Sequence, residues 1–287
     1  MRELREYLRP ESIEEAVAIK RERGCDAVYL AGGTDVLVLK PRGVTTVIDI
    51  MAVDAAGVHQ DGEAIVIGAT ALLCDIEQHP AVRTAVGGAL RQAIRETGPW
   101  LIRNAATLAG NVCNASPSAD SAAMLLTLDA ELTLSDGAVV SLDRFFVGPH
   151  ETVLTDELVK EIRLFPRGRL ARFHKHARSK SDIALVNLAV SARAKDGALH
   201  DVRIALGSVA PTPIRARETE RLLEGREIDA AVLRDVEASV RREIRPISDW
   251  RTSAEYRAHS AGLLVRRAVE GLLSDLERRS AEEGMDS

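Results

Sequence analysis

A loop of small and polar residues, AGGTD (Ala31–Asp35), follows the short run AVYL near the N-terminus. Glycine adopts backbone angles that other residues avoid, and it lets a ligand approach the main chain closely. Successive backbone N–H groups before a helix attract anions, Thr34 adds a hydroxyl donor, and Asp35 has an oxygen that can cap the helix. The loop is therefore predicted to bind a phosphate-like anion, although one glycine pair alone is more typical of a tight turn.

A second small-residue tract, TLAGNVCNASPSAD (Thr107–Asp120), strengthens this prediction. It contains too many Gly, Ser, Asn and Pro residues for a regular element, and it leads into the helical run SAAMLLTLDA. Two such loops from different subdomains could hold one diphosphate between them. Neither loop has the GxxxxGK[ST] spacing of a P-loop or the GxGxxG spacing of a Rossmann site, so a different type of dinucleotide site is expected.

The bulk composition is that of a globular protein with no preference for nucleic acid. The 287 residues are 46% hydrophobic and 28% charged, with a formal net charge of -5 and a pI of about 5.9. Three widely spaced cysteines, Cys25, Cys74 and Cys113, provide neither a disulfide framework nor a cysteine-only iron–sulfur or zinc site. The charged start of the chain has no apolar run resembling a signal peptide or a membrane span, so we expect a cytoplasmic protein.

The elements that must position the two loops are predicted from periodicity and from breaker residues. Ser12 and Glu15 form a capping box before a helix that Gly24 ends. The first loop then lies between a strand and a short helix, and the second follows a helix predicted over 81–96. In this half, strands are predicted at 27–30, 45–50 and 64–70, and helices at 35–40 and 121–130. A hairpin is predicted at 131–142.

The second half of the chain is predicted to combine an antiparallel sheet with helices. Strands are expected near 158–164 and 172–177, followed by a hairpin over 186–209 that turns at Asp196-Gly197. Helical periodicity then covers 218–223, 230–241 and 256–279.

Together, AGGTD and IRNAATLAGNVCNASPSADS resemble the paired motifs of the flavin-binding medium subunit of molybdenum hydroxylases, the family that includes xanthine dehydrogenase and carbon monoxide dehydrogenase. The resemblance extends over nearly the whole chain. It implies an α+β fold: a two-subdomain FAD-binding domain of the vanillyl-alcohol-oxidase (PCMH) type precedes a C-terminal α+β domain with an antiparallel sheet and helices. The expected divisions are 1–172 for the FAD-binding domain, with subdomains 1–55 and 56–172, and 173–287 for the C-terminal domain.

The same resemblance implies which residues surround FAD. The first loop would hold the diphosphate, the second would line its other side, and Lys175 in HKHARSKSDIA would lie near the flavin. Arg178, Asp182 and Ile183 would line the side that faces the electron acceptor. The expected cofactor-binding residues are Leu30, Ala31, Gly32, Gly33, Thr34, Asp35, Ile102, Ala106, Thr107, Ala109, Gly110, Asn111, Asn114, Ser116, Asp120, Val159 and Lys175.

Two positions depart from the family pattern. Ile183 lies where members of the carbon monoxide dehydrogenase branch tend to carry an aromatic residue over the flavin, so the resemblance favours the other branches over that one. The second tract usually contains Thr-Ile-Gly-Gly-Asn, whereas this chain has Ala109 in place of the first of the two glycines. A side chain with a Cβ atom disfavours left-handed backbone angles, so the backbone at Ala109 is expected to avoid them.

The resemblance implies an oxidoreductase subunit that binds FAD and takes electrons from 2Fe-2S clusters of a partner chain. The expected partners are an iron–sulfur small subunit and a molybdopterin large subunit, in a dimer of heterotrimers, and the acceptor would be NAD, a quinone or another soluble molecule. A chain with three scattered cysteines fits this arrangement, because it cannot ligate such a cluster alone. Lys175 near the flavin would stabilise the anionic reduced form and raise the reduction potential.

Two other functions and several single residues have competing interpretations. A self-contained flavin reductase would need a catalytic acid that the sequence does not identify, and a non-redox nucleotide or coenzyme A binding module would use the same loops without flavin.

His174 and His176 share one face of a strand with Lys175 opposite, but hydrogen-bonded structural histidines are favoured over a two-ligand metal site. Cys113 is interpreted as a small buried filler and Trp100 as a core or interface aromatic.

Overall fold

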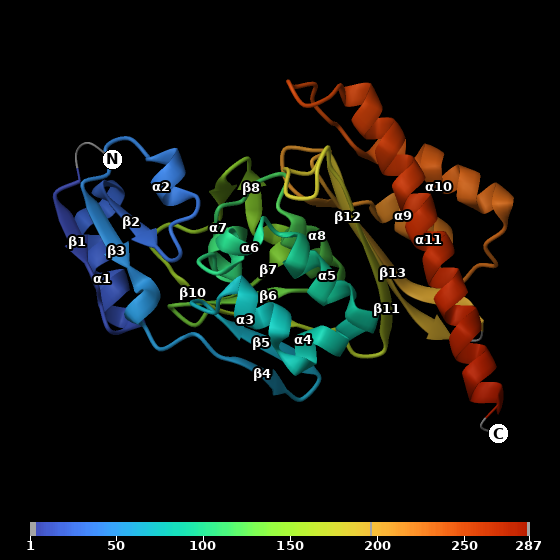
Figure 1. Cartoon of the computed structure of the whole chain (residues 1–287), viewed down its shortest axis with the longest axis horizontal. Coiled ribbons are helices and arrows are strands. Elements are labelled where there is room, and N and C mark those ends of the chain that lie inside the picture. The colour runs from blue at the N-terminus through green and yellow to red at the C-terminus, as the bar shows by residue number, and fades with distance from the viewer. Residues whose placement is uncertain (1–3, 196, 286–287) are drawn as a thin grey trace.

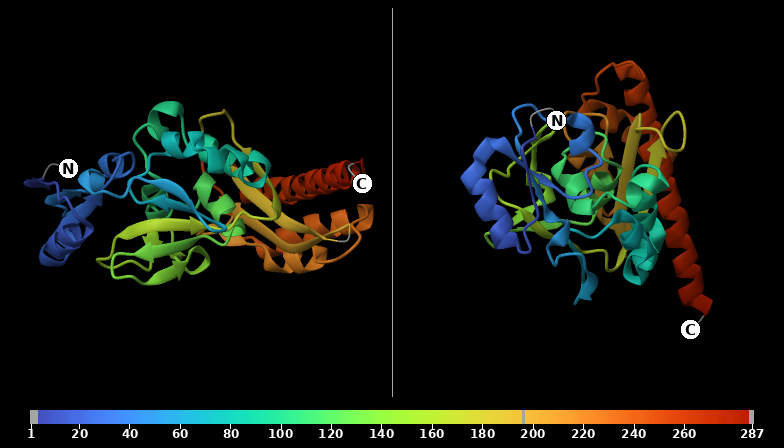
Figure 2. Two further views of the ribbon diagram at one scale, coloured as in Figure 1. Left: turned by 90° about the horizontal axis from the view of Figure 1, so that it is seen from below. Right: turned by 60° about the vertical axis from the view of Figure 1, so that its left-hand side comes forward.

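Three consecutive parts of the chain lie in a row along the long axis of the molecule (Figure 1; Figure 2, left). The computed structural model describes residues 4–195 and 197–285. The first part is a parallel three-stranded sheet in the order β1-β3-β2 with helix α1 packed on it. Its elements are β1 (Glu6–Leu8), α1 (Ile13–Arg23), η1 (Gly24–Asp26), β2 (Ala27–Leu30), α2 (Val36–Leu39), β3 (Thr46–Asp49) and η2 (Ile50–Ala52).

Both ends of α1 agree with the sequence pattern. The Ser12 hydroxyl accepts a hydrogen bond from the Glu15 amide at 3.1 Å. Gly24 follows the last residue with a φ of 56°, an angle that favours glycine. The predicted start and end of this helix are therefore confirmed.

The second part is built on an antiparallel sheet in the order β4-β5-β10-β6-β7, with a separate β8-β9 hairpin. The hairpin predicted over 131–142 is confirmed: β6 and β7 pair across a turn in which Gly137 has a φ of 89°. The strands are β4 (Val58–Asp61), β5 (Ala64–Gly68), β6 (Glu131–Leu134), β7 (Val139–Ser141), β8 (Phe146–Gly148), β9 (Glu151–Thr152) and β10 (Val159–Leu164).

Short helices pack with this sheet around the larger apolar core. The continuous helix predicted over 81–96 is wrong, because Val86, Gly87 and Gly88 have φ angles of 46°, 66° and 87°. Left-handed angles cannot continue a right-handed helix, and the glycine pair makes them accessible. The helices are α3 (Leu73–Gln78), α4 (Pro80–Thr84), η3 (Ala85–Gly88), α5 (Ala89–Glu96), α6 (Trp100–Arg103), α7 (Leu108–Cys113), α8 (Asp120–Thr127) and η4 (Leu142–Arg144).

The third part is an antiparallel sheet in the order β11-β12-β13-β14, followed by helices. The predicted hairpin is confirmed, with Gly197 at a φ of 75°, whereas Asp196 of its turn lies outside the described residues. No helix in the described ranges is both long and apolar enough to cross a bilayer. The elements are β11 (Arg169–His176), β12 (Val186–Lys195), β13 (Ala198–Gly207), β14 (Ile214–Arg215), α9 (Arg217–Leu223), α10 (Ala230–Glu243) and α11 (Ala254–Met285).

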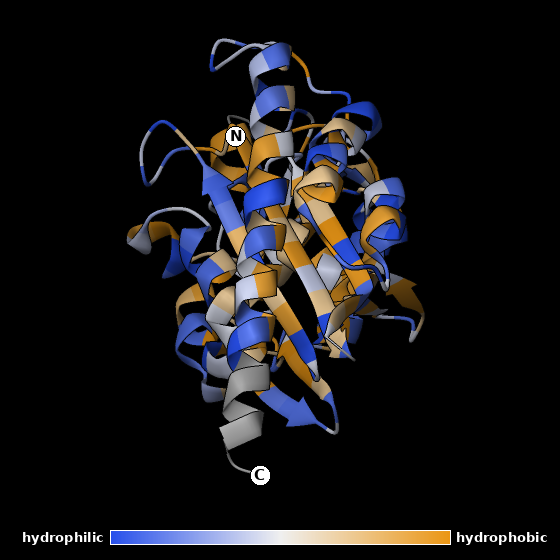
Figure 3. Cartoon of the chain, turned by 90° about the vertical axis from the view of Figure 1, so that its right-hand side faces the viewer, coloured by the Kyte–Doolittle hydropathy of each residue, from blue (hydrophilic) through white to orange (hydrophobic). Residues whose placement is uncertain are grey.

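The two faces of this last sheet pack into two different apolar cores. Phe173 and Ala189 belong to the core that contains α5 and α8, whereas Leu188, Val190 and Ile204 belong to the core under α10 and α11. Figure 3 shows α11 crossing the outer face, with hydrophobic strand segments beneath it. Alternate residues of a strand point to opposite faces, so the near-continuous apolar pattern of β12 is explained by burial on both sides.

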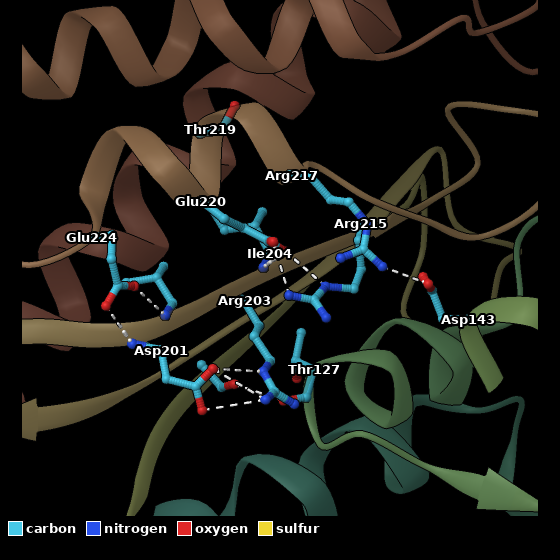
Figure 4. A network of polar contacts seen from close by, with 12 residues as sticks. Thr127, Asp143, Asp201, Arg203, Ile204, Arg215, Arg217, Thr219, Glu220 and Glu224 are labelled. Carbon is cyan, nitrogen blue, oxygen red and sulfur yellow. Dashed lines mark hydrogen bonds and ion pairs between the residues drawn. The ribbon is translucent and has the colours of Figure 1, made fainter. Parts of the chain in front are cut away.

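Ion pairs join the second and third parts (Figure 4). Arg203 on β13 pairs with Asp129, which follows α8, and also with Asp201 at 3.1 Å. Arg217 at the start of α9 reaches Asp143 in the second part at 2.5 Å. Burial lowers the pKa of Arg203 to about 10, so its guanidinium stays charged at neutral pH. These contacts support the apolar packing in fixing the C-terminal sheet against the second part. The predicted α+β fold class is confirmed.

Candidate functional site: a cavity between two loops

A cavity of about 850 Å³ lies where the three parts of the chain meet. It is lined by the β2–α2 loop, by helices α6 and α7 with the segment that leads to α8, by β10, and by the segment after β11. Every residue that the sequence places around the cofactor lines this cavity except Leu30, which is buried in the core. The structure therefore brings together two loops that are far apart in sequence.

Contact between the two loops depends on Gly32. A Cβ atom built on Gly32 would lie 1.7 Å from the carbonyl oxygen of Ala105, which is a severe overlap with backbone. A Cβ atom on Gly110 would lie 3.9 Å from the Cβ atom of Ala31. Gly32 is thus required for close packing of the loops as well as for an open main chain.

The first loop offers backbone donors to the cavity. Among the described residues, no hydrogen-bond acceptor is found for the amides of Gly32, Gly33, Thr34 and Asp35. The predicted side-chain cap by Asp35 is wrong, because its φ of -106° and ψ of -51° are helical rather than extended. Burial instead raises the pKa of the Asp35 carboxyl, and the charge of His150 opposes this rise.

The second tract is more regular than predicted, since it contains helix α7. The Thr107 hydroxyl caps this helix by accepting a hydrogen bond from the Gly110 amide at 3.0 Å. Asn111 is held by Ser121, whose hydroxyl donates to the Asn111 side-chain oxygen at 2.6 Å. Local side-chain hydrogen bonds thus compensate for the low helix propensity of the tract. Ala109 lies inside α7 and has no positive φ, as expected for a residue with a Cβ atom.

Replacing Thr107 with Ala is expected to loosen this side of the cavity. Loss of the cap should lower the free energy of unfolding by about 1 kcal/mol. It should also weaken FAD binding, since the Gly110 amide loses its fixed partner. Chemical denaturation and a fluorescence titration with FAD check both effects. Thr107→Ser keeps the hydroxyl and should behave like the wild type, and equal losses in the two variants would contradict a capping role.

A buried polar network lies beside the cavity. Lys175 on β11 donates to Asp120 at 2.7 Å and to the Glu96 carbonyl oxygen at 2.9 Å. Asn187 donates to the other oxygen of Asp120 at 2.8 Å and to the Ser118 carbonyl oxygen at 3.1 Å. The Lys175 and Asp120 side chains are only 5% and 8% exposed. Burial raises the pKa of Asp120 to about 6, against the attraction of Lys175.

Three residues after β11 were expected to face the electron acceptor, and two of them line the cavity. Asp182 and Ile183 line it, whereas Arg178 lies over the Trp250 ring at 4.8 Å and pairs with Asp182 at 3.4 Å. Arg178 therefore positions this segment from outside.

On β11, His176 bonds to Tyr256 at 3.0 Å, away from Lys175. The described ranges contain no cluster of three or more metal-binding side chains.

Two lining residues, Tyr29 and His150, carry no motif and were not identifiable from sequence. Tyr29 donates its hydroxyl to the Asp156 carbonyl oxygen at 2.8 Å, and burial raises its pKa. His150 bonds through Nδ1 to the Asn114 carbonyl oxygen at 2.9 Å and has a φ of 60°. Cys113 also lines the cavity, and burial raises the pKa of its thiol to about 12, which favours a filler over a nucleophile. Trp100 is 64% exposed, so it is not a core aromatic.

Comparison with known proteins agrees with this geometry. Residues 2–167 match the family model described as FAD binding domain in molybdopterin dehydrogenase, and residues 171–272 match the CO dehydrogenase flavoprotein C-terminal domain. The carbon monoxide dehydrogenase medium chain of Afipia carboxidovorans is 33% identical over 279 residues, covering 92% of this chain and 95% of that one. The putative xanthine dehydrogenase FAD-binding subunit of Escherichia coli is 27% identical over 277 residues, covering 92% and 94%.

Solved structures show the same fold. Carbon monoxide dehydrogenase from Hydrogenophaga pseudoflava, in a form which lacks the Mo-pyranopterin moiety of its cofactor, matches with a TM-score of 0.88 and 31% identity over 93% of this chain and 96% of that one. The fold and the cavity together define an FAD-binding oxidoreductase domain. More narrowly, the chain belongs to the family of FAD-binding medium subunits of molybdopterin dehydrogenases, and the resemblance seen in the sequence is confirmed.

Proposed function

We propose that the cavity holds FAD with its diphosphate between the two loops, and that the chain passes electrons from a partner subunit to a soluble acceptor. The observation that carries this proposal is the set of unpaired amides at Gly32–Asp35, which line a cavity closed on its other side by α7. Diphosphate oxygens are strong acceptors that suit several convergent N–H donors. The residues present therefore fit the cofactor.

Each group of lining residues has a proposed task. Thr107, Ala109, Gly110 and Asn111 close the far side of the diphosphate, and Asn114 and Ser116 add polar contacts. Apolar contacts to the rings come from residues such as Ile102, Ala106 and Val159, all of which line the cavity. When bound, FAD supplies the redox chemistry, while this chain binds it, orients it and limits its exposure to water.

Lys175 and Asp120 are proposed to present a fixed charge pair to the flavin. The lysine favours negative charge on the cofactor, which raises its reduction potential. Since Asp120 lies 2.7 Å from the ammonium, the effect is smaller than that of an unpaired cation. The carboxylate remains available as an acceptor for a ribose or flavin donor.

We further propose that the electrons come from 2Fe-2S clusters on a small subunit, supplied in turn by a molybdopterin large subunit, in a dimer of heterotrimers. The three cysteines of this chain are unpaired, and Cys113 lies in the cavity. Cysteine is the usual ligand of such clusters, so they must belong to another chain. The acceptor would be NAD, a quinone or another soluble molecule.

Purification and titration test this function directly. The chain, alone or in its complex, is expected to bind one FAD and to show flavin absorption in visible light. It should also copurify with an iron–sulfur subunit whose reduction is followed by bleaching of the flavin. Flavin without any partner would favour a self-contained reductase. No flavin absorption even after FAD is added would favour a non-redox nucleotide or coenzyme A binding module.

We also propose the division of the chain into 1–55, 56–172 and 173–287, with one refinement. Positions 172 and 173 lie within β11 (Arg169–His176), so a cut there would divide a strand. The connection between β10 and β11, residues 165–168, is a better boundary, because it lies between two sheets.

A further inference from the structure

His150 lines the cavity from the turn of the β8–β9 hairpin. Its amide donates to the Ala115 carbonyl oxygen at 3.0 Å, and its ring bonds through Nδ1 to the Asn114 carbonyl oxygen at 2.9 Å. The charge of His150 also acts on Asp35 in the first loop. The hairpin therefore forms a third wall of the cavity, next to both segments that are proposed to hold the diphosphate.

The backbone at this contact has an uncommon conformation. His150 has a φ of 60°, and Ala115, to which it bonds, has a φ of 47°. Left-handed angles are uncommon for residues that carry a Cβ atom, and residues that adopt them are concentrated at functional sites. Two hydrogen bonds between the turn and the end of α7 hold this arrangement, so the ring of His150 has a fixed place beside the cavity.

The same contact fixes the tautomer of the ring. A carbonyl oxygen can only accept a hydrogen bond, so Nδ1 of His150 must carry a hydrogen atom. Nε2 is then the nitrogen that gains or loses a proton, and no group in the described part of the chain bonds to it. Histidine has an ordinary pKa near 6.5, and a nearby anion favours the charged form of an imidazole.

The charges that line the cavity do not compensate a bound anion. Two lysines and no arginine line it, against the four carboxylates of Asp35, Asp120, Glu157 and Asp182. Both ammonium groups already have acceptors: Lys20 donates to the Gly24 carbonyl oxygen at 2.8 Å, and Lys175 donates to Asp120 at 2.7 Å. A diphosphate adds further negative charge. Among the described residues of the lining, His150 is the remaining base that can balance it.

We propose that His150 takes up a proton at Nε2 when FAD binds, and that the charged ring then donates a hydrogen bond to the diphosphate. This rests on the proposed function, because FAD must occupy the cavity. The proton comes from the buffer. Of the other titratable groups beside the ring, the carboxylates of Asp35 and Glu151 favour its charged form. Cys113 in α7 stays neutral, because burial raises the pKa of its thiol to about 12.

Calorimetric titration of the FAD-free complex with FAD, in two buffers of different ionisation enthalpy, counts the protons taken up. The wild type should take up about half a proton or more per FAD at pH 7.5, and its Kd should increase from pH 6.5 to pH 8.5. His150→Gln should take up none, and its Kd at pH 6.5 should be about tenfold above the wild-type value, as expected for loss of one charge-assisted hydrogen bond. His150→Lys carries a permanent charge and should bind FAD tightly at both pH values without proton uptake.

His59→Gln is the matched control, since His59 is exposed on β4 and does not line the cavity. Its proton uptake should equal that of the wild type. Proton uptake that persists in His150→Gln would overturn the proposal, including the case in which Asp35→Asn abolishes it instead. Equal losses of FAD affinity in His150→Gln and His150→Lys would also overturn it, because the bond to Asn114 rather than the charge would then matter. Wild-type protein that binds FAD without proton uptake refutes only this proposal, whereas wild-type protein that binds no FAD refutes the proposed function and this inference with it.

Discussion

Replacing Gly32 with Ala is expected to abolish FAD binding and to destabilise the chain. The new Cβ atom would lie 1.7 Å from the Ala105 carbonyl oxygen and 2.4 Å from its carbonyl carbon. The obstacle is backbone, which cannot rotate away as a side chain can, so the two loops must separate. Overpacking of this kind costs about 3 kcal/mol. For a chain of this size that corresponds to a fall of roughly 6–12 °C in melting temperature.

The FAD content of purified Gly32→Ala should fall more than tenfold, because separated loops no longer converge on one diphosphate. Visible absorption and thermal unfolding in the absence of FAD measure the two effects separately. Gly57→Ala is a matched control: a Cβ atom there meets nothing within 4 Å, and the backbone has no positive φ. A Gly32→Ala protein that keeps FAD and melts like this control would refute the tight contact between the loops.

Local sequence signals predicted most elements because those elements depend on short-range physics. The α1 cap, the β6-β7 turn at Gly137 and the long β12-β13 hairpin follow from residues next to one another in the chain. The break between α4 and α5 was missed because the apolar period continues across Gly87 and Gly88. Only the observed positive φ angles show that the glycines are used to turn the chain.

Only part of the cavity could be predicted from the sequence. A motif indicates where the backbone must be accessible to a ligand, but it does not indicate which other residues line the cavity. Both small-residue loops were found for this reason. Tyr29 and His150 were missed because they act through carbonyl oxygens of distant segments, Asp156 and Asn114. The helix α7 was missed because its stability comes from the Thr107 cap, which composition alone does not reveal.

Replacing Lys175 with Met is expected to destabilise the chain at neutral pH and less so in mild acid. Removing one partner of a buried ion pair costs about 3–5 kcal/mol when the other stays charged. Burial already raises the pKa of Asp120 to about 6, and loss of the lysine raises it further. A carboxyl group whose pKa is raised by folding stabilises the folded state at pH values below its ordinary pKa, which is near 4. This stabilisation is lost as the pH rises through the folded-state pKa. The deficit relative to wild type should therefore be large at pH 8 and small at pH 5.

Urea unfolding of FAD-free protein at the two pH values measures this deficit without the contribution of cofactor binding. Adding Asp120→Asn to Lys175→Met should recover much of the lost stability at pH 8, because no buried charge remains, and should remove the pH dependence. Lys160→Met on β10 is the control, since Lys160 forms no ion pair in the described part of the chain. A deficit that is equal at both pH values, or a double variant no more stable than Lys175→Met, would mean that packing of the lysine stem rather than its charge supports this side of the cavity.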